Sequence, residues 1–249
     1  MGLFYNFQKE GKGVPKDQKT PRLVLFFQVY FRKFWNLLLL NLLYVLFCIP
    51  VVTIGPATAG MTKILRNYAR EEHAFLWGDF IETFKKNFKQ AFLYSLIDLL
   101  VTGFLVLDFL CIYSLQNKVM LILCLAAILL TFTVWTFMRY YVYNMMITFR
   151  LTMGQLLKNA FIFCWVGFLR NLLITVVIVG LPLILALRID VFFILLITVY
   201  LSFSGFLINF MVNPLIKKHM IDGFDPETGE RLEEEKYEGF EEIDQTNEN

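Results

Sequence analysis

The chain has 249 residues, of which 57% are hydrophobic, 17% are aromatic and only 18% are charged. This composition excludes an ordinary soluble domain and indicates a helical membrane protein with several spans. The formal net charge of +2 hides an asymmetry, since residues 1–221 carry 21 Lys and Arg against 9 Asp and Glu, whereas residues 222–249 carry 2 against 12.

The chain begins with a polar arm, residues 1–33, that holds seven Lys and Arg. Residues 22–33 are predicted to form an amphipathic segment at the membrane surface. No cleavable signal peptide is expected, because the apolar run that follows lacks a small-residue cleavage pattern. We therefore expect three regions: a cytoplasmic basic arm (1–33), a single helical transmembrane domain (34–221) and an acidic, partly disordered cytoplasmic tail (222–249).

The first apolar run, residues 34–62, has no charged side chain and is longer than the roughly 20 residues that a helix needs to cross a membrane. Pro50, Gly55 and Pro56 interrupt it, and each proline removes a backbone donor and disfavours helical angles in the preceding residue. A helix that begins at Pro56 would leave the next two backbone amides free for an anionic or polar group. Alternatively, the small residues only allow close packing at a hairpin turn.

Basic residues follow this break at helical spacing. Lys63, Arg66 and Arg70 share one face of a predicted amphipathic helix. Lys63 and Arg66 would extend the positive field of the helix start, so they are candidate ligands for a lipid phosphate, an anionic sugar or a carboxylate. Whether residues 51–70 span the membrane, re-enter it or lie on it stays open.

Four further apolar segments have close to membrane-crossing length. They are Ala91–Ser114, Val119–Met138, Asn171–Leu187 and Val191–Val212. The links near Lys118 and Arg188 are so short that the flanking spans must form antiparallel hairpins, and Tyr140, Tyr141 and Tyr143 are predicted to form an interfacial aromatic cluster. The predicted fold class is an all-α, polytopic helical membrane protein with five clear spans and a short or re-entrant sixth leg. Because basic connections mark the cytoplasmic side, both termini should be cytoplasmic.

Charged residues at membrane depth are costly and are therefore functional candidates. Asp98 and Asp108 both lie in the span that begins at Ala91, and Asp98 can meet Arg139 because the short link forces the two helices together. The contact would be either a packing ion pair or part of a substrate or proton site. Four asparagines are predicted to form hydrogen bonds between helices: Asn36, Asn41, Asn209 and Asn213.

The sequence offers no catalytic, metal-binding or nucleotide-binding motif. His73 and His219 are far from any ligand partner at metal-binding spacing, and the four cysteines lie in apolar sequence without a CxxC pair. No GxxxxGK[ST] or GxSxG motif occurs. We expect no enzyme activity, no cofactor, no metal and no nucleic-acid partner.

Two segments resemble a known family. NLLLLNLLYVLFCIPVVTIGPATAGM, followed by GDFIETFKKNFKQAF, is similar to the YesL family of bacterial membrane proteins, domain of unknown function 624. The resemblance covers the first 95 residues or so and supplies no catalytic residues. Since members are often encoded beside carbohydrate-uptake transporters, it implies a multi-pass cell-membrane protein of Gram-positive-type bacteria with an accessory role in sugar uptake.

Two functions stay open at this point. The first is a non-catalytic accessory or scaffold component associated with carbohydrate uptake, with a sugar ABC-transporter permease or its ATPase as partner. The second is a small carrier or channel for a polar or anionic solute. It would use the broken helix and the intramembrane charges, namely Lys63, Arg66, Asp98 and Arg139.

Overall fold

The computed structural model describes residues 21–112, 117–185 and 199–221, and within these ranges every regular element is a helix. The all-α prediction is confirmed for this part of the chain. The predictions for residues 1–20, the tail 222–249 and the link at residue 188 lie outside the described residues. The helices are α1 (Arg22–Arg32), α2 (Phe34–Phe47), the 3-10 turn η2 (Val51–Thr53), α3 (Ile54–Ala69), α4 (Leu76–Lys86), α5 (Phe88–Cys111), α6 (Lys118–Thr148), α7 (Met153–Val166), α8 (Phe168–Leu185), α10 (Leu201–Ile216) and the π-helical η5 (Lys217–Ile221).

Two of the described helices, α5 and α6, are each long and apolar enough to cross a membrane. Two bent pairs would each add one broken span: α1 with α2, bent by 71°, and α7 with α8, bent by 90°. The described residues thus contain two to four candidate spans. The finer expectation of five or six membrane legs remains a prediction.

The predicted break in the first apolar run is a hairpin turn between α2 and α3. At the end of the hairpin opposite the turn, Arg32 of α1 and Glu71, just after α3, form an ion pair. Near the turn, the Tyr44 hydroxyl of α2 lies 3.2 Å from Thr58 Oγ1 of α3. Thr53 Oγ1 contacts the carbonyls of Phe47 and Pro50 at 2.5 and 2.6 Å, and so helps to close the turn. The two helices are therefore antiparallel neighbours.

The start of α3 differs from the prediction, because the helix begins at Ile54 and not at Pro56. Proline is tolerated here since the first turn of a helix has no intrahelical partners for its backbone amides. A Cβ on Gly55 would lie 2.2 Å from the Ala91 carbonyl oxygen, so α3 packs directly on the α5 backbone at this point.

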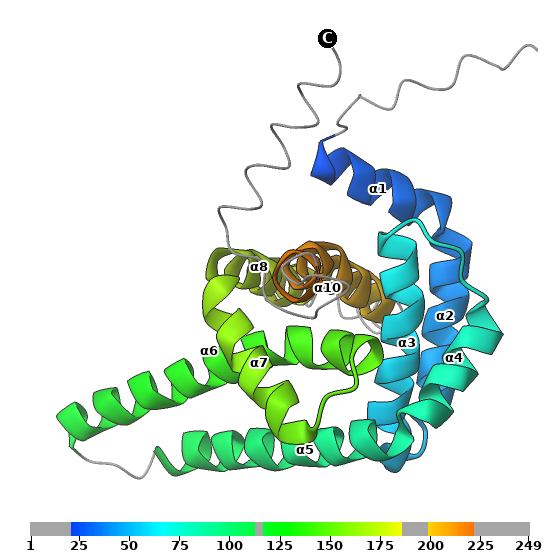
Figure 1. Cartoon of the computed structure of the whole chain (residues 1–249). Coiled ribbons are helices and arrows are strands. Elements are labelled where there is room, and N and C mark those ends of the chain that lie inside the picture. The colour runs from blue at the N-terminus through cyan, green and yellow to red at the C-terminus, as the bar shows by residue number, and fades with distance from the viewer. Residues whose placement is uncertain (1–20, 113–116, 186–198, 222–249) are drawn as a thin grey trace, which may run out of the picture.

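The central element of the fold is α3, which packs against α2, α4, α5, α6 and α10. Most of its residues are buried, including Arg66 and Asn67. Figure 1 shows α3 in the body of the molecule and the α5–α6 hairpin projecting from it. The projecting part exposes apolar side chains such as Leu99, Phe104 and Leu123, as a lipid-facing surface would.

Helix α6 continues to Thr148, well past the predicted end of its span at Met138. No proline or glycine interrupts this stretch, so nothing local ends the helix. The predicted interfacial cluster of tyrosines is wrong as a surface feature: Tyr141 is fully buried and Tyr140 is 7% exposed in the core.

A buried hydrogen-bond cluster stabilises the sharp corner between α7 and α8. Asn171 Nδ2 donates to the carbonyls of Phe163 and Cys164, at 3.5 and 3.2 Å, and its Oδ1 accepts a 2.7 Å bond from the Tyr141 hydroxyl. The bond to Cys164 supplies a donor for a carbonyl in the last turn of α7, whereas the Phe163 carbonyl also accepts from the Gly167 amide at 2.9 Å. A Cβ on Gly167 would lie 2.2 Å from the Tyr141 hydroxyl, so the corner needs glycine there.

Candidate functional site

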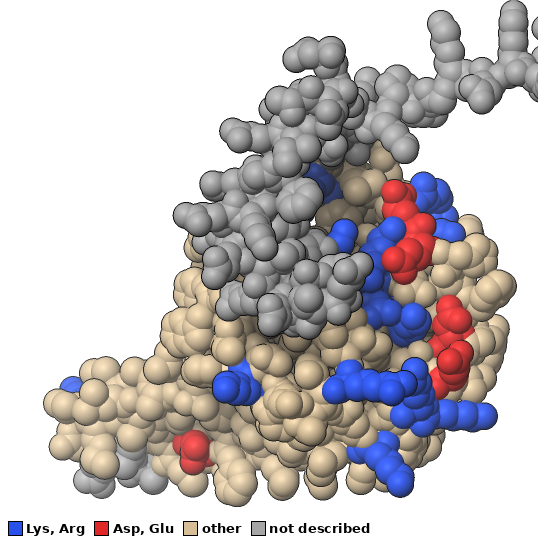
Figure 2. Space-filling view, viewed as in Figure 1, with Lys and Arg blue, Asp and Glu red and all other residues tan. Residues whose placement is uncertain are grey.

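A charged concavity lies where α3, α4, the start of α5 and the α6–α7 loop meet. Its volume is about 680 Å³. Three cations and two carboxylates line it: Lys63, Lys86, Arg150, Asp79 and Glu82. We call this concavity the charged hollow. Figure 2 shows that charged side chains gather over this part of the visible face, whereas the projecting hairpin carries few.

The charged residues of α4 that line the hollow share one face of the helix. Asp79, Glu82 and Lys86 recur at intervals of three and four residues, so they lie on one face of α4. Phe80 on the other side is fully buried. A Cβ on Gly60 would lie 3.0 Å from the Phe80 carbonyl oxygen, and this close approach brings α4 against α3 beside Lys63.

The opposite wall is the loop from α6 to α7, and hydrogen bonds hold it in place. Gln90 Nε2 of α5 donates to the Leu151 carbonyl at 2.8 Å. Thr152 and Gln155 form a reciprocal capping box at the start of α7. Arg66 of α3, which does not itself line the hollow, donates from Nη1 to Oγ1 of the lining residue Thr148 at 2.5 Å. The charged hollow is thus built from three chain segments with fixed positions.

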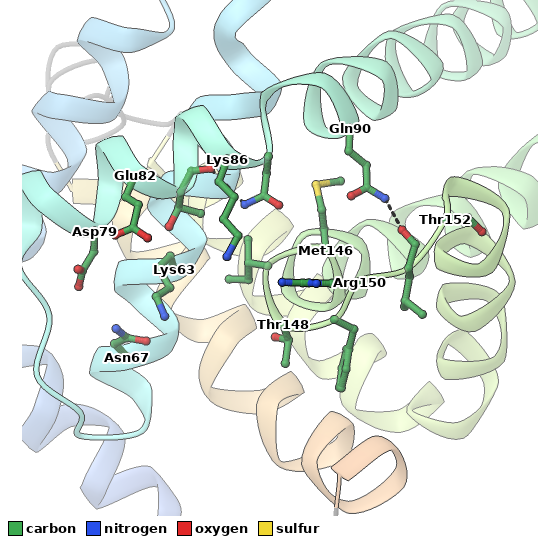
Figure 3. Close-up of a pocket in the computed structure, with 15 residues that line it drawn as sticks. Lys63, Asn67, Asp79, Glu82, Lys86, Gln90, Met146, Thr148, Arg150 and Thr152 are labelled. Atoms are coloured by element: carbon green, nitrogen blue, oxygen red, sulfur yellow. Dashed lines mark hydrogen bonds between the residues drawn. The ribbon is translucent and has the colours of Figure 1, made fainter. Parts of the chain in front are cut away.

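The cations of the charged hollow have no ion-pair partner among the described residues. The ion pairs of this part of the chain lie elsewhere, between Arg32 and Glu71, Arg70 and Glu72, and Arg139 and Asp98. Figure 3 shows the ends of Lys63, Lys86 and Arg150 turned toward the same space, with Asp79 and Glu82 on the α4 side.

The pKa of Lys63 in the charged hollow is lower than that of an ordinary lysine. Lys63 lies on α3, outside the candidate spans. Burial lowers the pKa of Lys63, the Arg66 guanidinium lowers it further, and Asp79, Glu72 and Glu82 act in the opposite direction. A carboxylate placed beside Lys63 would raise this pKa again, since an opposite charge favours the charged form of the amine.

The other two charged candidates, Asp98 and Arg139, do meet. Arg139 Nε donates to Asp98 Oδ1 at 2.6 Å, and Trp135 Nε1 donates to the same oxygen at 2.8 Å. Arg139 Nη2 also donates to Thr102. The expected contact between Asp98 and Arg139 is present, and its geometry fits a packing ion pair between α5 and α6.

The predicted site residues therefore separate into three places. Lys63 faces the charged hollow, while Arg66 is 6% exposed and is enclosed behind its wall. Asp98 and Arg139 lie together on the α5–α6 contact. The third place is the helix break at Pro50, Gly55 and Pro56, where Gly55 packs against the α5 backbone. No charged side chain lies between residues 47 and 62.

Sequence reasoning did not single out four of the five charged residues of the hollow. Asp79, Glu82 and Lys86 look like an ordinary solvated face of an amphipathic helix, and Arg150 lies in a connection far away in the sequence. Only the fold brings them beside Lys63. Within the described residues, no group of three His, Cys, Asp or Glu side chains is arranged to hold a metal ion.

Residues 37–109 match the family model described as "Protein of unknown function, DUF624". This match confirms the resemblance to domain of unknown function 624. It covers α3, α4 and most of α2 and α5, and so includes the side of the charged hollow formed by Lys63, Asp79, Glu82, Lys86 and Gln90. No curated protein and no solved structure matches the chain.

Proposed function

We propose, on the premise that residues 37–109 of this membrane protein form a DUF624 segment, that the chain is a non-catalytic accessory or scaffold component of a carbohydrate-uptake system. Its partner would be the permease or the ATPase of a sugar ABC transporter. The proposal includes a multi-pass arrangement in the cell membrane with both termini in the cytoplasm. The family resemblance and the basic connections of the sequence support these points.

The charged hollow is the observation that carries the proposal. It is a preformed concavity with three cations that have no ion-pair partner among the described residues. Lys63 is half-buried, whereas Lys86 and Arg150 are exposed. An incoming carboxylate would pair with these cations, and the ion pair would gain strength where the bound partner excludes water. The expected occupant is an acidic segment of the partner, with its carboxylates on Lys63, Lys86 and Arg150.

The mixed charge of the hollow supports a protein partner over a simple anion. Asp79 and Glu82 on the α4 side would repel a free phosphate or a second carboxylate that bound too close to them. A peptide segment that also carries a basic residue could meet both signs of charge. This arrangement gives specificity and fixes the register of the bound segment.

The test is co-purification from the native host of the full-length protein and of charge variants. Lys86→Gln and Arg150→Gln should each reduce recovery of the transporter subunit by up to about fivefold, because an ion pair at an exposed side chain contributes about 0.2–1 kcal/mol. Lys85→Gln is the matched control, since Lys85 is exposed on the same helix and does not line the hollow. Equal recovery with all three variants would contradict the proposal.

A second candidate function, a small carrier or channel for a polar or anionic solute, is favoured by a different observation. Arg139 lies on the walls of two neighbouring half-open clefts, about 270 and 580 Å³ in volume, and shares this position with Thr58 and Tyr143. A side chain between two clefts at membrane depth is where a solute path would need a polar group. Flux measurements on Arg139→Gln in vesicles would test this candidate.

A further inference from the structure

A further concavity lies where the start of α1, the end of α3 and the end of α10 meet. It is a half-open cleft of about 440 Å³, and it shares no lining residue with the charged hollow in the described part of the chain. Figure 1 shows α1 at the edge of the molecule beside the end of α3, which it contacts. We call this concavity the basic cleft.

The basic cleft carries an excess of positive charge. Arg22 of α1, Arg70 after α3 and Lys217 after α10 line it, and Glu72 is the one carboxylate of its described lining. Arg70 Nη1 lies 3.9 Å from Glu72 Oε1. Arg22 and Lys217 have no ion-pair partner among the described residues, and both side chains are exposed, so a ligand can reach them. Two accessible cations from different chain segments are therefore left for an anionic group.

Most of the other lining residues are apolar. Leu25 of α1, Ala69 of α3, and Phe210 and Pro214 of α10 form this part of the basic cleft. A free phosphate ion would leave the apolar surface uncovered. A molecule that joins a phosphate to a less polar skeleton would cover this surface as well as pair with the cations.

The geometry of α1 places the basic cleft beside lipid. Helices α1 and α2 form a candidate broken span with a bend of 71°, so an α2 that crosses the bilayer leaves α1 close to the membrane plane. Exposed apolar side chains follow α1 and the start of α2 at intervals of four residues: Leu23, Phe27, Phe31 and Trp35. Such a stripe is typical of a helix in the lipid interface. Arg22 and Leu25, at 100° per residue, lie on another side of α1 and line the cleft.

We propose that the basic cleft binds the headgroup of an anionic phospholipid, with its phosphate paired with Arg22 and Lys217 and its glycerol end against the apolar lining. Basic pockets between membrane helices hold anionic headgroups in this way. A zwitterionic headgroup fits less well, because its own cation meets the excess positive charge of the cleft. The site should therefore prefer phosphatidylglycerol to phosphatidylcholine.

The test is native mass spectrometry of the full chain in detergent, titrated with phosphatidylglycerol or with phosphatidylcholine of the same acyl chains. We expect one saturable phosphatidylglycerol site. Arg22→Gln and Lys217→Gln should each weaken it about fivefold, the effect of one basic side chain near anionic lipid. Lys218→Gln is the matched control, because Lys218 is exposed next to Lys217 and does not line the cleft.

Glu72→Gln gives a variant with the opposite expected sign. It removes the one carboxylate of the described lining and should strengthen phosphatidylglycerol binding by up to about fivefold. A loss of folding cannot produce this result. Lys86→Gln and Arg150→Gln in the charged hollow should leave lipid binding unchanged, so this inference and the docking function succeed or fail separately.

Three outcomes would overturn the proposal. The first is equal binding of the two lipids, or equal effects of Lys217→Gln and Lys218→Gln. The second is displacement of the lipid by inorganic phosphate at the ionic strength of a chloride control, which would identify a site for free anions. The third is lipid binding that appears only when Glu233, Glu234 and Glu235 are all changed to Gln, which would assign the basic cleft to the acidic tail of the chain.

Discussion

Gln90 of α5 donates a hydrogen bond from Nε2 to the backbone carbonyl of Leu151, 2.8 Å away and 61 residues later in the chain. This bond ties the α6–α7 loop to the start of the α5–α6 hairpin. It thereby fixes the distance between Arg150 on the loop and Lys86 at the end of α4. A single amide side chain thus shapes the charged hollow without contributing charge to it.

Gln90→Leu should loosen the loop without unfolding the protein. The variant removes one hydrogen bond, which costs about 1 kcal/mol, and we expect faster hydrogen exchange at the amides of residues 150–152. Hydrogen exchange followed by mass spectrometry measures this directly. Gln28→Leu is the control, since Gln28 is exposed on α1. Unchanged exchange in the loop would show that Gln90 does not hold it.

Gly55→Ala should destabilise the packing contact between α3 and α5. The added Cβ would lie 2.2 Å from the Ala91 carbonyl oxygen, a backbone atom that cannot move alone. Overpacking of this kind costs about 1–3 kcal/mol, seen as a lower thermal unfolding midpoint in detergent. Gly103→Ala on α5 meets nothing within 4 Å and should be neutral or slightly stabilising. Equal midpoints for both variants would contradict the close packing of Gly55 on the α5 backbone.

Asp98→Asn should leave the Arg139 guanidinium without its counter-ion. We expect a loss of about 1–3 kcal/mol of stability, typical of a hydrogen bond to a charged group. The double variant Asp98→Asn with Arg139→Gln should recover part of the loss, because it removes the unpaired charge as well. Asp108→Asn, on the exposed side of the same helix, is the control. If both single Asp variants behave alike, the ion pair does not stabilise the fold.

Asn171→Leu should destabilise the corner between α7 and α8. It leaves the Tyr141 hydroxyl and the carbonyls of Phe163 and Cys164 without this partner, at a cost of about 1–3 kcal/mol. Asn213→Leu should change stability much less, because the Nδ2 of Asn213 has no hydrogen-bond partner in the described residues. The thermal midpoints of the two variants decide the question, and the reverse order would refute the role given to Asn171.

The sequence predicts the features that depend on local physics. Apolar runs predict α5 and most of α6, the amphipathic pattern with basic residues at its two ends predicts α1, and the prolines predict the turn between α2 and α3. The short link after α5 also predicts that Asp98 meets Arg139, because it forces the two helices to pack side by side.

Features that depend on long-range packing were not predictable. The charged hollow unites Lys63, the α4 residues and Arg150 from segments that no local pattern connects. The burial of Tyr140 and Tyr141 was missed because an interfacial aromatic cluster and a core tyrosine cluster have the same composition. The corner at Asn171 has no sequence signature, since an asparagine at the start of an apolar run reads as a boundary residue.

Site-specific photo-crosslinking in the native membrane tests the docking role of the charged hollow most directly. Benzoylphenylalanine in place of Phe149, a lining residue, should crosslink to one sugar-transporter subunit through an acidic segment, and Arg150→Gln should suppress that product. The same probe in place of Phe104, which is 65% exposed on the projecting hairpin, should not yield it. A Phe149 probe that crosslinks to no protein, or to the same proteins as the Phe104 probe, would contradict the account.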